Sequence, residues 1–132
     1  MIHEINIYAV LAAAFVSFIF GALWYSPLLF LSRWCKEAGV DPNKNISNPA
    51  KVYGVTFLLT LTSAVVLAMV LGVNPELSTA IITGGVVGSG LVVTSMGINY
   101  QFSGSSLRHW LIDGFFQIFR FTIMGLVLGL WH

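Results

Sequence analysis

Charge is scarce in this sequence. Of its 132 residues, six are Lys or Arg and five are Asp or Glu, together 8%, whereas a soluble domain carries about 25%. Hydrophobic residues make up 57% of the chain, and the mean hydropathy is +0.87. A chain of this length cannot bury so much apolar surface in water, because small domains bury only part of their surface. The composition therefore excludes a soluble globular domain and a disordered chain.

Groups that would indicate other functions are also rare. The one cysteine, Cys35, cannot form an internal disulfide. The net charge of +1 comes without any basic cluster, so we expect no nucleic acid partner. His109 and Asp113 are two metal ligands at best, and no glycine-rich nucleotide loop carries a lysine. We therefore expect no metal, no cofactor and no enzyme, since acid, base and nucleophile are too few.

Long apolar stretches are what the chain does contain. The ranges 5–26, 52–73 and 79–100 hold no charged residue. A fourth span is expected at about 108–131, where the apolar stretch from about Trp110 is interrupted by Asp113 and Arg120. Each is long enough to cross a bilayer core, which takes roughly 20 helical residues. Lipid leaves no solvent partner for the backbone, so the stretches are predicted to be helices. We predict an all-α, four-transmembrane-helix bundle, one integral membrane domain over residues 1–132, with the first stretch retained rather than cleaved as a signal peptide.

A short interfacial segment is expected after the first span. Residues 28–37 are apolar at first and then mixed, so after Pro27 they can turn and lie in the interface as a short helix, with Trp34 dipping in. Gly39 is a plausible end for that helix. Asn48–Pro49 is typical of a helix cap followed by its first residue.

The other connections are short. A turn is expected at residues 41–43, and the links 74–78 and 101–106 are tight. Short links between helices favour antiparallel neighbours, so the second, third and fourth spans are predicted to pack side by side.

Basic residues predict the orientation. Loops between spans one and two and between spans three and four carry all five Lys and Arg outside the spans: Arg33, Lys36, Lys44, Lys51 and Arg108. The opposite side carries Glu4 and Glu76 and no basic residue. Because Lys and Arg gather on the cytoplasmic side, both termini are predicted to face outside. The expected location is a bacterial cytoplasmic (inner) membrane.

Three strings suggest a relationship. They are Gly-Ala-Leu-Trp-Tyr-Ser-Pro-Leu-Leu-Phe at 21–30, Ile-Asn-Tyr-Gln-Phe at 98–102 and Ile-Met-Gly-Leu-Val-Leu-Gly-Leu-Trp at 123–131. With them the chain resembles, over nearly its whole length, a bacterial membrane-protein family known as domain of unknown function 1761. The resemblance implies a small four-span protein, and it implies no activity and no functional residue.

The aromatic corner, Trp24, Tyr25 and Ser26 followed by Pro27, has two interpretations. In the first, the aromatic residues anchor the helix end at the membrane interface and the proline ends the helix. In the second, an indole, a phenol and a hydroxyl form a binding corner beside carbonyl groups that the proline leaves free. Aromatic belts need no ligand, so the first interpretation is the simpler one.

Small residues recur at helical spacing. The first span carries Ala9, Ala13, Ser17 and Gly21 on one face, and two G-x-x-x-G pairs stand at 84/88 and 125/129. Small residues let helices approach closely in lipid, either within one protomer or between subunits of an oligomer. Five glycines lie in the third span, so we predict that this span is central in the bundle.

The strongest polar signal lies in the fourth span. At about 100° per residue, Asp113, Gln117 and Arg120 lie at about 40°, 80° and 20° from His109, so all four share one stripe. A charge at the position of Arg120, near the middle of the span, costs at least about 2.5–3.5 kcal/mol. We therefore predict that Asp113 and Gln117 are its partners, from the same helix or from a neighbouring subunit.

Two functions remain open at this point. In the first, the chain forms a homo-oligomer in the lipid bilayer, a dimer or trimer of parallel subunits, and acts as a channel or carrier. The stripe then faces the pathway; it consists of His109, Asp113, Gln117 and Arg120. In the second, the protein is a structural or accessory membrane protein, and the stripe only stabilises the bundle.

Overall fold

The protein is all-helical, and no strand occurs in the part of the chain that the structure, a computed structural model, describes, namely residues 5–41, 43 and 48–132. Four helices are long and apolar enough to cross a membrane: α1 (Ile7–Trp24), α3 (Pro49–Leu71), the continuous helix formed by α4 (Leu77–Val87), η2 (Gly88–Val93) and α5 (Thr94–Ser103), and α6 (Leu107–Leu130). Each overlaps one predicted stretch. The predicted fold class is confirmed.

The predicted helix ends are found where the sequence places them. The short helix α2 (Leu31–Ala38) follows Pro27 and ends at Gly39, whose φ of 73° lies in the left-handed region. Asn48 caps α3 by accepting a hydrogen bond from the Lys51 N–H, and Pro49 is the first residue of the helix. Three residues of the sequence prediction, Glu4, Lys44 and Pro42 in the turn at 41–43, lie outside the described residues.

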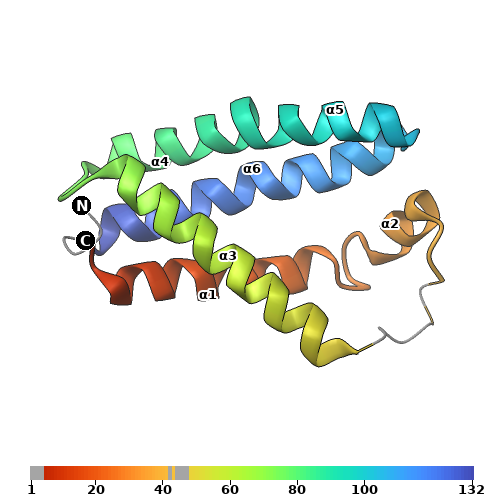
Figure 1. The fold of residues 1–132 in the computed structure, drawn as a ribbon, viewed down its shortest axis with the longest axis horizontal. Helices are drawn as coiled ribbons and strands as arrows, with labels where there is room; N and C mark the ends of the chain where they lie inside the picture. The colour runs from red at the N-terminus through yellow and green to blue at the C-terminus, as the bar shows by residue number, and fades with distance from the viewer. Residues whose placement is uncertain (1–4, 42, 44–47) are drawn as a thin grey trace.

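Helix α6 is central in the bundle. It packs against α1 on one side and against α4, η2 and α5 on the other, and α3 crosses obliquely over α1 and α6 (Figure 1). The prediction that the glycine-rich third span is central is therefore wrong: Leu77–Ser103 has the smallest buried share of the four spans, and α6 has the largest. Glycine lets one face of a helix approach a single neighbour closely, but a central helix needs neighbours on several faces.

Helix α3 packs mainly on α1 rather than on α4. The small face of α1 explains this choice, because Ala9 and Ala13 are fully buried and allow another helix to come close. Together with Ala64, Leu67 and Met124 they belong to the hydrophobic core, which lies where α1, α3 and α6 meet. The short link at 74–78 joins α3 to α4 and does not make them packing partners along their length, as the sequence had suggested.

Glycines bring the backbones of α4 and α6 into contact within one protomer. A Cβ atom added at Gly84 would collide with the main-chain carbonyl of Phe121, and one added at Gly125 would collide with that of Ala80. At Gly88, an added Cβ would lie 3.0 Å from the carbonyl oxygen of Gln117. Both G-x-x-x-G pairs are therefore used inside the protomer, because no other residue permits such a close approach.

A π-helical turn interrupts the third span, which the sequence does not reveal. Within η2, the carbonyl of Val93 accepts a hydrogen bond from the Trp110 indole at 3.0 Å. The indole ring lies against Gly97, where an added Cβ would come within 3.1 Å of Trp110 Nε1. The turn thus helps to fix α5 beside the start of α6, and π-turns often occur near functional sites.

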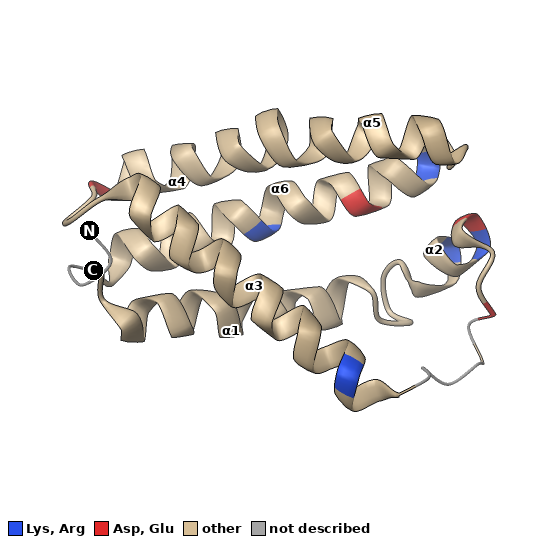
Figure 2. Cartoon of the chain, in the orientation of Figure 1, with Lys and Arg blue, Asp and Glu red and all other residues tan. Residues whose placement is uncertain are grey.

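Charge is distributed unequally between the two ends of the bundle. Arg33, Lys36, Lys51 and Arg108 lie at the end where α2 is found, and Glu76 lies at the opposite end, where α1 begins and α6 ends (Figure 2). Only Asp113 and Arg120 carry charge inside the described membrane helices away from their first and last turns. We call the end with α2 the basic end.

The close contact of α4 with α6 predicts how substitutions of its glycines change the stability of the protein. Gly84→Ala and Gly125→Ala should each lower the free energy of unfolding by about 1–3 kcal/mol, because the added methyl group forces two backbones apart. The matched control is Gly54→Ala in the interior of α3, where an added Cβ meets nothing within 4 Å. That variant should be as stable as the wild type or more so, since alanine favours helix by about 1 kcal/mol. Thermal unfolding in detergent measures all three, and equal melting temperatures would contradict the close contact.

Candidate functional site

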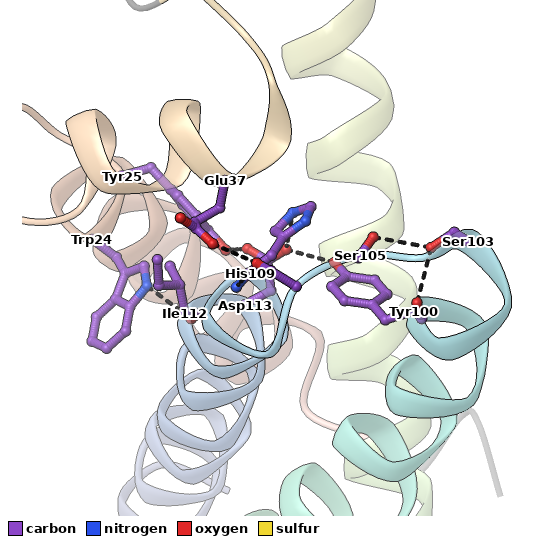
Figure 3. Close-up of polar contacts among 10 residues, drawn as sticks. Trp24, Tyr25, Glu37, Tyr100, Ser103, Ser105, His109, Ile112 and Asp113 are labelled. Atoms are coloured by element: carbon purple, nitrogen blue, oxygen red, sulfur yellow. Dashed lines mark hydrogen bonds and ion pairs between the residues drawn. The ribbon is translucent and has the colours of Figure 1, made fainter.

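A buried carboxylate forms the centre of the polar cluster. Asp113 in α6 is 7% exposed and accepts a hydrogen bond from the Tyr25 hydroxyl on Oδ1 and from the Tyr100 hydroxyl on Oδ2, both at 2.5 Å (Figure 3). Nε2 of His109 lies 3.2 Å from Oδ2. We call Tyr25, Tyr100, His109 and Asp113 the Asp113 cluster. Its members come from the end of α1, from α5 and from α6, so one carboxylate joins three helices.

The end of α1 is what positions Tyr25. The residue caps the helix, and its N–H bonds the carbonyl of Gly21. The neighbouring Trp24 donates from its indole to the carbonyl of Ile112 at 3.2 Å. Ser26 turns away and bonds the carbonyl of Leu23 at 2.6 Å. The two rings of the aromatic corner thus connect the end of α1 to α6.

Helix α2 lies over the cluster at the basic end. The ring of Trp34 packs edge-to-face against Tyr25 and against His109, with centroid distances of 5.9 Å in each case. Glu37 accepts a hydrogen bond of 2.5 Å from the hydroxyl of Ser106, the residue that caps α6. Trp34, predicted to dip into the interface, instead faces the protein. The cluster is therefore covered on the side where α6 begins.

Within one protomer, Asp113 does not pair with Arg120, so the same-helix form of this prediction is wrong. A pair between neighbouring subunits stays a prediction. Nε of Arg120 donates to Gln117 Oε1 at 2.9 Å, as predicted, and the guanidinium lies 4.5 Å from the centroid of the Phe121 ring. Over the described ranges, the only contact of Asp113 with a basic side chain is with His109. Two turns separate Asp113 from Arg120, about 10 Å along the axis. Both carboxylate oxygens are taken by the tyrosines, which lie at the depth of Asp113 and are closer than the guanidinium.

The predicted stripe therefore divides into two parts. His109 and Asp113 belong to the Asp113 cluster, and Gln117 and Arg120 form a separate pair deeper in the span. Neither Tyr100 nor Tyr25 was expected as a hydrogen-bond partner of Asp113. One signal was available: both tyrosines stand at the ends of spans that the topology brings to the same side as Asp113, and a buried carboxylate requires hydrogen-bond donors.

The chemistry of the cluster is that of hydrogen bonding around one carboxyl group. Its other members are one imidazole and two phenols, and each of these can donate or accept a hydrogen bond. Among the residues whose placement is described, no group of three or more His, Cys, Asp or Glu side chains could hold a metal ion. Cys35 is buried in α2 and contributes no group to the cluster.

The hydrogen bonds of the cluster can be measured by a double-mutant cycle. Tyr25→Phe should lower the free energy of unfolding by about 2 kcal/mol, because the lost bond has a charged acceptor. Combined with Asp113→Ala, its effect should shrink, giving a coupling energy of about 0.5–3 kcal/mol. Tyr8→Phe in the exposed part of α1 makes the same chemical change away from the cluster and should be additive with Asp113→Ala. Unfolding in detergent by a denaturant gives the four free energies of each cycle, and additivity at Tyr25 would show that the bond contributes nothing.

Comparisons with known proteins place the chain in a family. The family model described as "Protein of unknown function (DUF1761)" matches residues 8–129. No curated protein and no solved structure matches the chain. The matched residues include, almost to their ends, all four helices that could cross a membrane, together with the whole Asp113 cluster, Gln117 and Arg120. The resemblance that the sequence strings suggested is thereby confirmed, and the chain belongs to the family of proteins of unknown function DUF1761.

Proposed function

We propose that this protein is a homo-oligomeric membrane channel or carrier, and that the stripe of α6 faces the pathway. The observation that carries the proposal is that the charge of Arg120 has no acidic partner within reach in the described part of the chain. Its guanidinium lies near the middle of a membrane helix and is only half-buried, and its one hydrogen bond to a side chain among the described residues goes to the neutral amide of Gln117.

A charge in that position requires compensation. A charge near the bilayer centre costs several kcal/mol unless it is paired or hydrated. The nearest acidic residue in the sequence of the span, Asp113, is already bonded to two tyrosines. Water in a pathway, a passing solute or a second subunit would satisfy the guanidinium, and the first two are properties of a channel or carrier.

A parallel dimer or trimer in the lipid bilayer fits the same observation. Helix α3 crosses obliquely and its first half lies beside α1 and away from α5 (Figure 1). Gln117 and Arg120, in the middle of α6, stay partly exposed in the single protomer. Transport or binding also suits the residues better than catalysis does, because acid, base and nucleophile are too few for a reaction.

The alternative is a structural or accessory role without transport. It is favoured by the Asp113 cluster itself, in which both carboxylate oxygens are satisfied and three helices are held together. A locked carboxylate of this kind stabilises a bundle whether or not anything passes through it. The two functions differ in whether water reaches Gln117 and Arg120.

Access of water to the stripe can be tested by cysteine labelling. Gln117→Cys, in a Cys35→Ala background and in proteoliposomes, should react with a charged methanethiosulfonate reagent, because the reagent needs water and an ionised thiol. Phe115→Cys is the matched control, since it is two residues away on α6, is exposed and points to another face. It should not react. Absence of reaction at both positions, together with a monomer in native mass spectrometry, would favour the structural role.

The proposed orientation has the basic end in the cytoplasm of a bacterium, with the protein in the inner membrane and both termini outside. The support is the positive charge at one end, contributed by Arg33, Lys36, Lys51 and Arg108, with Glu76 at the other (Figure 2).

Fusions to the C-terminus test this orientation. An alkaline phosphatase fusion should be active and a green fluorescent protein fusion dark, because the first folds outside the cytoplasm and the second inside. Four charge-reversing substitutions at the basic residues named above should weaken the preference and give mixed activity. A fluorescent fusion with an inactive phosphatase would overturn the assignment.

A further inference from the structure

We propose that Asp113 is a proton-binding site which is loaded from the basic end through His109, and that the proton is the coupling ion of this protein. The second part rests on the proposed transport function, whereas the first does not. The inference starts from the kind of partners that surround the carboxylate, since none of them is a fixed cation.

All three partners of Asp113 can reverse their hydrogen-bonding role. A Lys or Arg side chain only donates, so it stabilises a carboxylate in its ionised form alone. A tyrosine hydroxyl donates one bond and accepts others, and a neutral imidazole donates from one nitrogen and accepts at the second. When Asp113 takes up a proton, Tyr25 or Tyr100 can accept the new O–H bond and the cluster stays satisfied. The cluster is therefore suited to both states of the carboxyl group.

The charged and titratable groups around Asp113 are few. Helix α1 presents Tyr25, α5 presents Tyr100, and α6 presents His109 and, two turns deeper, Arg120. Helix α4 and η2 contain no titratable side chain.

Helix α2 adds no charge to the cluster directly. It places Trp34 against Tyr25 and His109, while its Glu37 is bonded to Ser106. The other charged side chains of this helix, Arg33 and Lys36, are exposed. Of the groups that face Asp113, only His109 has two ring nitrogens, so it can take up a proton at one nitrogen while it gives one from the other.

His109 is the neighbour of Asp113 on the side of the basic end. It stands one turn nearer that end, its side chain is 15% exposed, and that of Asp113 is 11% exposed. A proton from water binds one ring nitrogen, and Nε2 gives its proton to Oδ2 at 3.2 Å. The imidazole is left neutral in its other tautomer, and the carboxylate has gained one proton. The reverse transfer restores both groups.

Proton binding at Asp113 can be observed directly. Infrared difference spectra of the protein in lipid, recorded on acidification, should show the carbonyl stretch of a newly protonated carboxyl group. The sequence has only five acidic residues, so the band can be assigned. It should be absent in Asp113→Asn, shifted in Asp113→Glu and retained in the matched control Glu76→Gln at the opposite end of the molecule. A spectrum of Asp113→Asn identical to that of the wild type would overturn the proton site.

Loading through His109 predicts a kinetic effect. In proteoliposomes that contain a pH-sensitive dye, a potassium diffusion potential should drive proton entry in the wild type and not in Asp113→Asn. The side chain of His109→Gln keeps about the size of the imidazole and one hydrogen-bond donor but cannot relay a proton. Proton entry should therefore slow by roughly a hundredfold, and it should recover when imidazole is added to the buffer. Recovery separates a relay from a purely structural role, because a collapsed cluster is not restored by a buffer.

The outcomes distinguish this inference from the proposed function. If position 117 is labelled but no proton enters, the proposed channel or carrier is supported and the proposal that the proton is its coupling ion is overturned. An Asp113 band without labelling at 117 and without proton entry would keep the proton site and overturn transport. An unchanged rate in His109→Gln would overturn loading through the imidazole.

Discussion

The buried carboxylate of Asp113 is the interaction on which the arrangement of the helices depends. In lipid a polar group has no solvent to bond, so an acidic residue inside a span has to draw its donors from the protein. Tyr25 and Tyr100 supply them from α1 and α5, and this brings both helices to the same level of α6. Trp24 and Trp110, which each bond a main-chain carbonyl, strengthen the same two junctions. The basic end of the bundle is thus held by polar contacts.

The opposite half of the bundle is held by close packing. Lipid chains are as apolar as leucine, so helices associate there through van der Waals contact rather than through the hydrophobic effect. Gly84 and Gly125 allow main-chain contact between α4 and α6. Ala9 and Ala13 are small and fully buried in the core where α1 packs on α3. Helix α6 takes part in both the polar and the close-packed half, which explains why it is the central helix. Arg120 lies near the middle of α6, between the polar half and the close-packed half of the bundle.

This division gives the proposed functions their physical setting. One half of the bundle is close-packed around α6, while the basic half contains the Asp113 cluster and the covering helix α2. Polar groups inside a membrane are costly, and they persist where they bind or conduct something or where they specify a structure. The Asp113 cluster satisfies the structural requirement by itself, whereas the pair of Gln117 and Arg120 leaves a charge without a counter-charge in the described chain.

The sequence by itself determined the number and the approximate positions of the four long apolar helices, because these depend on local composition. It also determined the end of α2 at Gly39 and the start of α3 at Asn48 and Pro49. It also determined that His109, Asp113, Gln117 and Arg120 share one face of a helix, since helical geometry is fixed. Only the tertiary structure decided which helix is central and which partners satisfy Asp113. Those outcomes depend on contacts between residues far apart in the chain, such as Tyr25 and Asp113, and the spacing of residues along one helix carries no information about what faces it across the bundle.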